Sequence, residues 1–309
     1  MIAYLSNSIN RQLNESQLSS DKLSAPLGLQ LKNADVPAAD SGQADGEATH
    51  TGLLIINADD WGRSSKETDA ILECALRGAV SSASAMVFME DSERSAVIAQ
   101  QRKLDVGLHL NFTTSFTAPQ CPAPLLQRQQ ELARHLLLHR LAQAVFHPGL
   151  VRSFEYVVRS QLDEFRRLYQ KDPDRLDGHH HMHLCANVLL EGLLPPGTYA
   201  RRNFSFRAGE KSFVNRLYRQ LVDLRLARRH RLVDFFFSLP PFQPPDRLQQ
   251  IFSLAQKYVV EVETHPVNPE EYEFLAEGEV FRRAGNLRIA PRFCADGSLR
   301  ARHSFLALK

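Results

Sequence analysis

Cysteine is scarce in this sequence, and the few cysteines are scattered. The 309 residues contain four of them, Cys74, Cys121, Cys185 and Cys294, and no two form a Cys-x-x-Cys pair. Zinc ribbons and disulfide frameworks need closely spaced cysteines, so the spacing argues against both classes. The sequence therefore favours a reducing compartment.

Long apolar runs and targeting signals are also missing. No stretch approaches the roughly 18 apolar residues of a membrane-spanning helix, and residues 1–7 lack the basic and apolar regions of a signal peptide. We therefore expect no transmembrane segment and a cytoplasmic location. The net charge of +2 indicates no particular partner, and neither a nucleic-acid-binding motif nor an internal repeat is visible.

The first 51 residues differ in composition from the rest. They are rich in Ser, Asn, Gln, Asp, Ala and Gly, and hold three basic against six acidic residues, a charge of 3 − 6 = −3. Such a segment has too few apolar side chains to form a core of its own. We predict that residues 1–51 are disordered or loosely docked and that residues 52–309 form a single domain.

Strand and helix patterns alternate from residue 53 onward. Apolar runs bounded by turn residues predict strands at 53–60, 85–89, 106–112, 177–183, 198–204, 232–237 and 258–266. Helical patterns lie between them, with a longer helical insertion over 125–169 that either covers the rim of a site or acts as a structural cap. This order predicts an α/β fold, a distorted or incomplete (β/α) barrel of about seven parallel strands.

Several of these strands end in residues that bind metals or move protons. Asp59 and Asp60 end the first strand, His109 lies on the third, and Asp177 opens a segment with four histidines, DGHHHMH. His265 follows the last strand. In parallel α/β folds the reacting groups gather at the carboxyl ends of strands. Alone, each has a plainer explanation: a capping acid, a core histidine or a turn.

Together these side chains fit a catalytic metal site. A carboxylate and two imidazoles with open positions are typical of catalytic rather than structural ions, and such an ion activates water and polarises a carbonyl. A second carboxylate can take the proton of the water, and a histidine can protonate the leaving amine. Asp59 and Asp60 would point to opposite faces of a regular strand, so the scheme requires a sharp turn there. In an extended strand His179, His181 and His183 would share a face.

The chain resembles the YdjC-type carbohydrate deacetylases, a family that includes chitooligosaccharide deacetylases. The matching segments are 57–62 (NADDWG), 107–111 (GLHLN), 177–183 (DGHHHMH) and, more loosely, 264–266 (THP). The resemblance implies a (β/α)-barrel-like fold and removal of an N-acetyl group from an amino sugar. Residues 1–51 lie outside it.

The resemblance also implies roles for individual residues. Asp60, His109 and His179 would hold one divalent metal ion, Asp59 would be the general base, and His265 the general acid. A further group would contact the sugar or orient the ligands: Trp61, Asn111, Asp177, His181 and His183. Arg201 and Arg202 either contact substrate or are surface charges, and we favour the second interpretation.

The expected partner is an N-acetylated sugar, oligosaccharide or glycoconjugate, and a homo-oligomer is compatible with the sequence. The ligand set suits zinc better than magnesium, although members of the family are often described as magnesium enzymes. Two alternatives stay open: a metal hydrolase acting on another amide, an ester or a phosphoester, and a non-catalytic glycan- or metal-binding protein of a polysaccharide assembly system.

A basic run lies between residues 201 and 231. It holds ten Lys and Arg residues against Glu210 and Asp223. Such a run either binds a polyanion or a membrane surface, or is the solvated face of a helix. The helical spacing of Phe213, Leu217 and Leu221 favours the solvated helix face.

Overall fold

A computed structural model describes residues 52–139, 141–206 and 210–293, which belong to one compact α/β unit. The expectation for residues 1–51 lies outside the described residues. Within the described ranges, no helix is long and apolar enough to cross a membrane. Cys74, Cys121 and Cys185 are free thiols.

The strands of the described residues form one parallel sheet with the order β5-β4-β3-β2-β1-β7-β6. The seven strands are β1 (Leu53–Trp61), β2 (Ser82–Ala85), β3 (Val106–Leu110), β4 (Arg175–Gly178), β5 (Tyr199–Ala200), β6 (Phe235–Ser238) and β7 (Val259–Thr264). The two edges approach each other at Ser205, whose backbone N–H donates to the Phe236 carbonyl at 2.8 Å. The sheet is therefore a distorted, incomplete barrel of seven parallel strands, which confirms the predicted fold class.

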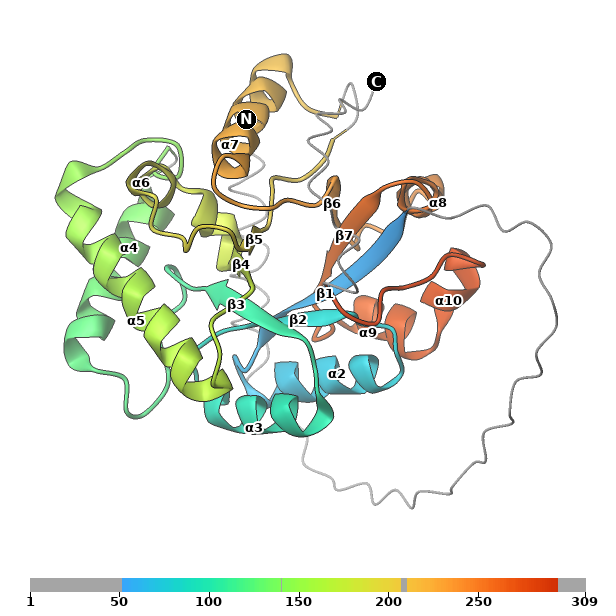
Figure 1. Cartoon of the computed structure of the whole chain (residues 1–309), viewed down its shortest axis with the longest axis horizontal. Coiled ribbons are helices and arrows are strands. Elements are labelled where there is room, and N and C mark those ends of the chain that lie inside the picture. The colour runs from blue at the N-terminus through green and yellow to red at the C-terminus, as the bar shows by residue number, and fades with distance from the viewer. Residues whose placement is uncertain (1–51, 140, 207–209, 294–309) are drawn as a thin grey trace. The chain divides into compact units, whose positions relative to one another are not determined.

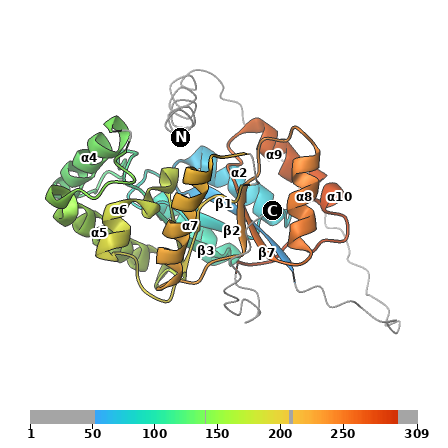
Figure 2. The same ribbon diagram turned by 90° about the horizontal axis from the view of Figure 1, so that it is seen from above.

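Helices surround the sheet (Figure 1). They are α2 (Ser65–Leu76), α3 (Ser92–Arg102), α4 (Ala123–Leu138), α5 (Val151–Tyr169), α6 (Ala186–Glu191), α7 (Phe213–Ala227), α8 (Asp246–Ala255), α9 (Pro269–Ala276) and α10 (Glu279–Ala284), with the 3₁₀ helices η1 (Pro148–Leu150) and η2 (His179–Leu184). Figure 2 shows the strands between α4, α5 and α6 on one side and α8, α9 and α10 on the other.

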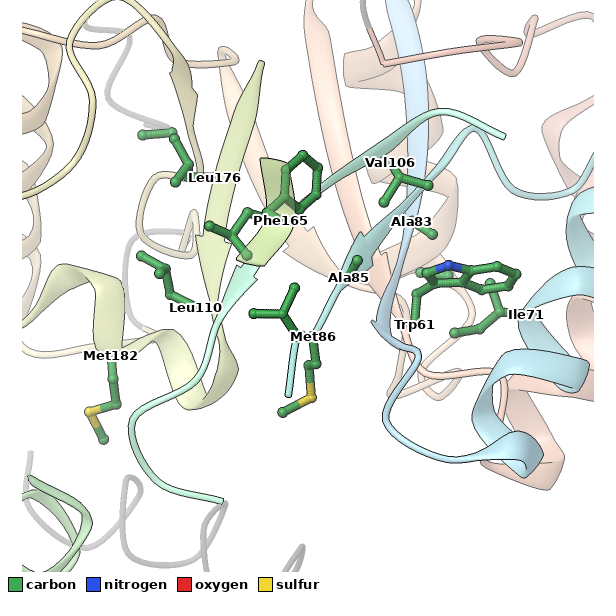
Figure 3. Close-up of a cluster of buried hydrophobic side chains, with 14 of the residues drawn as sticks. Trp61, Ile71, Ala83, Ala85, Met86, Val106, Leu110, Phe165, Leu176 and Met182 are labelled. Carbon is green, nitrogen blue, oxygen red and sulfur yellow. The ribbon is translucent and has the colours of Figure 1, made fainter. Parts of the chain in front are cut away.

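The hydrophobic core explains why β1 is central. Leu54, Ile55 and Ile56 are at most 1% exposed, because β1 has neighbours on both edges and packed side chains on both faces. Burying each such side chain contributes about 1.5–3 kcal/mol to folding. Figure 3 shows part of the larger cluster, in which Trp61 and Ile71 lie together.

Several predicted boundaries are wrong for local reasons. The second strand is 82–85 rather than 85–89, and the fifth shrinks to two residues. Gly278, with a φ of 77°, separates α9 from α10. The helix predicted from residue 125 ends at Leu138. The loops after β2 and β5 therefore begin earlier than the apolar pattern suggested.

Candidate active site

The carboxyl end of β1 carries two adjacent acids that lie close to the same histidine. The pairing of β1 with β2 is irregular between Ala58 and Trp61, and Asp60 has a left-handed φ of 69°. A bulge of this kind re-aims a side chain. Asp59 and Asp60 are both buried, and each has a carboxylate oxygen within 4.0 Å of a ring nitrogen of His109. The bulge thus supplies the turn that the scheme requires.

Asp60, His109 and His179 form a compact set of potential metal ligands. Asp60 Oδ1 lies 3.0 Å from His179 Nδ1 and 3.4 Å from His109 Nε2. Asp60 Oδ1 and His109 Nε2 are buried and accept or donate no hydrogen bond within the described structure. An unsatisfied buried polar atom costs about 1–3 kcal/mol. A cation shared by the three side chains would satisfy these atoms, so the residues fit a metal ion.

Asp177 fixes the orientation of the His109 ring. His109 Nδ1 donates to Asp177 Oδ1 at 2.8 Å, and Ser84 Oγ donates to Asp177 Oδ2 at 2.6 Å. When the ring is neutral with its proton on Nδ1, its lone pair is on Nε2, which faces Asp60. Histidines that bind metals commonly donate their second ring N–H to a carboxylate in this way.

The histidine-rich segment does not continue β4 as a strand, so the expectation of a shared face is wrong. It forms η2, in which His180 and His181 have left-handed φ values of 53° and 55°. The four histidine side chains therefore leave the backbone in different directions. Gly178 allows this turn, because a Cβ there would lie 2.9 Å from the His183 backbone nitrogen.

His181 lies at an aromatic wall beside the ligand set. Its ring meets Phe204 edge to face at a centroid separation of 4.7 Å, and Phe204 stacks on Phe236 at 4.6 Å. His181 Nε2 lies 3.6 Å from Glu263 Oε2. With its side chain 27% exposed, His181 is accessible to a ligand in a way that the buried His179 is not.

Arg201 is the central cation of the site, so its interpretation as a surface charge is wrong. It follows β5, is 2% exposed, and donates to both oxygens of Asp59 at 2.6 and 2.8 Å. Its Nη2 also lies 2.8 Å from Asp177 Oδ2. His183 is buried and its Nε2 lies 2.9 Å from the Arg201 carbonyl oxygen. His183 thus holds the backbone of Arg201 in place.

Two buried acids of β7 complete this ion-pair cluster and were missed from the sequence. Arg201 Nε donates to Glu261 Oε1 at 2.7 Å, and Arg201 Nη1 lies 3.3 Å from Glu263 Oε2. The signal was the alternation VVEVET in a strand, which places both glutamates on one face. Burial and the nearby Asp59 charge raise the pKa of Glu263 to about 8, because the single Arg201 charge is shared among several carboxylates.

His265 lies directly after β7 and is surrounded by acids. Its backbone N–H donates to Glu271 Oε2 at 2.8 Å. Burial acts to lower the pKa of His265, but the charges of Glu271, Asp59 and Asp60 outweigh it and raise the pKa above its usual value. The environment therefore favours a protonated imidazole, the state that a general acid needs.

Trp61 and Asn111 have structural contacts. Trp61 is 0% exposed within the main core cluster, so no face of its ring is open to the sugar contact that the resemblance offers as one of its two roles. Asn111 Oδ1 accepts from the backbone N–H groups of Thr113 and Thr114 at 3.1 and 2.9 Å. It shapes the loop after β3, in which Thr113 Oγ1 lies 3.0 Å from His180 Nδ1.

The charge of the site favours a bound cation. Five buried carboxylates surround it, those of Asp59, Asp60, Asp177, Glu261 and Glu263. Burial acts to lower the pKa of His109, but the charges of Asp59 and Asp177 outweigh it and raise the pKa to about 10. A field strong enough to hold a proton on this imidazole also attracts a divalent cation to the same nitrogen.

The YdjC-like protein family matches residues 53–284 of this chain. A chitooligosaccharide deacetylase of Proteus mirabilis (strain HI4320) is 35% identical over 137 residues, which cover 44% of this chain and 52% of the relative. One of Enterobacter sp. (strain 638) is 29% identical over 177 residues, or 57% of this chain and 64% of the relative. The chain thus spans about half to two thirds of the length of these relatives.

A solved structure shares the fold. It is described as a candidate cellobiose-phosphate cleavage protein of Enterococcus faecalis V583 and superposes with a TM-score of 0.53 over 77% of this chain and 97% of its own. The two sequences are 18% identical, so the similarity concerns the fold alone.

Proposed function

Because this chain belongs to the YdjC-like family, we propose that it is a metal-dependent hydrolase that removes the N-acetyl group from a GlcNAc-type sugar or glycoconjugate. The observation that carries the proposal is the buried set Asp60, His109 and His179, with Asp59 beside it. The activity named for the two relatives supports the substrate class.

One carboxylate and two imidazoles would hold the ion, a donor set that suits Zn²⁺ better than Mg²⁺. When bound, a divalent ion would supply Lewis-acid chemistry: it would lower the pKa of a nearby water and would polarise the acetamide carbonyl. Asp177 keeps the His109 lone pair directed at the site through the 2.8 Å hydrogen bond to Nδ1. Arg63 holds Asp60 through the other oxygen, Oδ2, at 2.9 Å.

Asp59 is the general base in this proposal. Arg201 donates to both of its oxygens, and Asn57 Nδ2 donates to Oδ1 at 2.9 Å. The carboxylate therefore has a fixed orientation. Each carboxylate oxygen has two lone pairs. Oδ2 therefore keeps acceptor capacity beyond the Arg201 bond and can take a proton from the attacking water.

His265 is the general acid. The neighbouring carboxylates favour its protonated form, so a proton is available for the amine as the C–N bond breaks. His181 and Phe204 supply an aromatic wall for the sugar ring. Aromatic faces pack well on the C–H groups of a pyranose, and the His181 nitrogen can bond a hydroxyl.

The electrostatics favour a neutral amide over a phosphoester. Five buried carboxylates lie at the site, and the buried guanidinium of Arg201 is already paired with those of Asp59 and Asp177. A phosphodiester would add a further negative charge to this field, whereas an acetamide adds none. An anionic substrate would thus bind less well than a neutral one of similar size.

The test is acetate release from N-acetylglucosamine oligomers by the full chain, with a phosphodiester as the competing substrate. After chelator treatment we expect no acetate release, and we expect zinc, cobalt or magnesium to restore it. Turnover of the phosphodiester alone would replace the deacetylase proposal by another metal hydrolase.

Two variants separate catalysis from metal binding. Asp59→Asn should lose acetate release by about 10²–10⁴-fold, the usual contribution of a general base, with metal content unchanged in elemental analysis. His109→Ala should lose metal itself. If Asp59→Asn keeps full activity, the catalytic scheme is wrong; if His109→Ala keeps full metal occupancy, the ligand assignment is wrong.

A further inference from the structure

Helix α7 presents an apolar stripe to the solvent. The exposed fractions are 71% for Phe213, 67% for Val214, 44% for Leu217, 57% for Leu221 and 39% for Leu224. At 3.6 residues per turn these positions lie on one side of the helix. Exposed large side chains are common singly, but a contiguous stripe marks an interaction surface.

The opposite side of α7 is fastened to the domain, which fixes the direction of the stripe. Asp223 is buried, and its Oδ2 accepts from Arg202 Nη2 at 2.9 Å. Its Oδ1 accepts from the backbone and side-chain nitrogens of Asn203, both at 2.9 Å. Leu226 is buried on the same side. Turning the stripe inward would break this buried ion pair, so its exposure is built into the fold.

Unpaired arginines border the stripe. Within the described part of the chain, Arg216, Arg225 and Arg228 form no ion pair. Asp223 is the only acid of the helix, and it already forms an ion pair with Arg202. In Figure 1, α7 lies across the sheet from α2 and α3. The outer face of α7 is thus apolar along its centre and basic at its margin.

We propose that the outer face of α7 docks on an anionic phospholipid surface. A helix with Phe and Leu on one face and Arg beside them lies in the membrane interface, with its apolar side chains in the acyl boundary. Each Arg near an anionic surface adds attraction. A second copy of this chain is a poorer occupant, because a two-fold contact through α7 would gather the arginines of both copies at one interface, while the acid of α7, Asp223, is already paired with Arg202.

Vesicle co-sedimentation of the full chain tests the proposal. Vesicles of phosphatidylcholine alone and of phosphatidylcholine with equimolar phosphatidylglycerol are compared at low and high salt. We expect binding to the anionic vesicles that weakens with salt. The double variant Leu217→Ser/Leu221→Ser should bind at least about ten-fold more weakly, and Arg225→Gln/Arg228→Gln about five-fold more weakly for each arginine removed.

Control variants lie away from α7. Leu76→Ser changes a leucine that is 61% exposed on α2, and Arg102→Gln changes an exposed arginine of α3; both should bind as the wild type does. Leu217→Trp adds a second reporter. The only native tryptophan, Trp61, is 0% exposed, so quenching by lipids with brominated acyl chains reports on residue 217.

Three results would overturn the proposal. The wild type could stay in the supernatant with every vesicle, or the Leu217→Ser/Leu221→Ser variant could bind as tightly as the wild type. Light scattering could also show a wild-type dimer that this double variant dissociates, which would make a second copy the occupant. Acetate release measured on soluble oligomers is a separate readout and is expected to be unchanged in all of these variants.

Discussion

Replacing Arg201 with methionine should destabilise the domain strongly, because it leaves a group of buried acids without their cation. The guanidinium contacts Asp59, Asp177, Glu261 and Glu263 at 2.6–3.3 Å. Methionine is flexible and unbranched like the stem of arginine, but it is shorter and carries no charge. Its thioether cannot donate to any of the four carboxylates, so each loses a hydrogen bond that water cannot replace.

The expected magnitude follows from the burial of the cluster. The side chains of Arg201, Asp177 and Glu261 are each 1% exposed. Breaking a buried ion pair by removing one partner costs about 3–5 kcal/mol. For a domain of this size that corresponds to a fall in Tm of about 10 °C. Arg201→Lys keeps one charge but not the two-pronged contact with Asp59, and should fall in between.

The loss of stability in Arg201→Met should depend on pH in a defined direction. Burial acts to raise the pKa of Asp177, but Arg201 and His109 outweigh it and hold the pKa below its usual value. A carboxylate with a depressed pKa stabilises the fold above its ordinary pKa and loses that contribution as pH falls. The difference in Tm between wild type and Arg201→Met should therefore be largest near neutral pH and shrink in acid.

Thermal unfolding of chelator-treated protein, followed by circular dichroism across a pH series, measures the effect. Arg77→Met is the matched control, since the Arg77–Glu73 pair is exposed, and its Tm should equal that of the wild type. A wild-type Tm for Arg201→Met at neutral pH, or a deficit that grows in acid, would refute the electrostatic account of this cluster.

Three further predictions concern the surrounding residues. Gly178→Ala should cost about 1–3 kcal/mol of stability, because its Cβ would lie 2.9–3.0 Å from His183 atoms; urea unfolding measures this. Asp177→Asn should weaken metal binding by about 10- to 100-fold in a metal titration, because His109 loses its carboxylate acceptor. The pKa of Glu263 is raised from 4.5 to about 8 by folding, so this group lowers the stability of the fold as pH rises through that range. Glu263→Gln should therefore reduce the loss of stability with rising pH in chelator-treated protein.

Each of these predictions has a contrary outcome. Gly149→Ala is the control for Gly178→Ala, because its Cβ would meet only the exposed His147 ring, at 3.1 Å. Equal losses of stability in the two variants would mean that the contact with His183 is not the cause. Unchanged metal affinity in Asp177→Asn would show that ring orientation does not limit binding. Parallel pH curves for wild type and Glu263→Gln would show that this glutamate is not protonated at neutral pH.

Much of the candidate site was predictable because its residues follow strands whose pattern is plain. The apolar run of β1 ends at Asp59 and Asp60, and the parallel order brings His109 to the same edge of the sheet. The motif around His179 was visible as a cluster of rare residues. Strand order alone thus predicts which side chains meet, since parallel strands share a carboxyl edge.

Other features could not be predicted from local patterns. The resemblance places Trp61 among the residues that contact the sugar or orient the ligands, yet the irregular end of β1 places its ring in the core. The stripe of α7 has the spacing of a core helix, but the buried pair of Asp223 with Arg202 turns it outward. Periodicity predicts that a helix has two faces, and long-range contacts decide which of them is buried.

The sequence by itself determined the α/β class, the seven strands and the acids and histidines gathered at their ends, because side-chain period and strand order are local and repetitive properties. Only the tertiary structure decided the roles of Arg201 and the β7 glutamates. A charged residue at the end of a two-residue strand has no local signature of burial. Its environment is set by acids 24 to 142 residues away, which the curled sheet brings around one guanidinium.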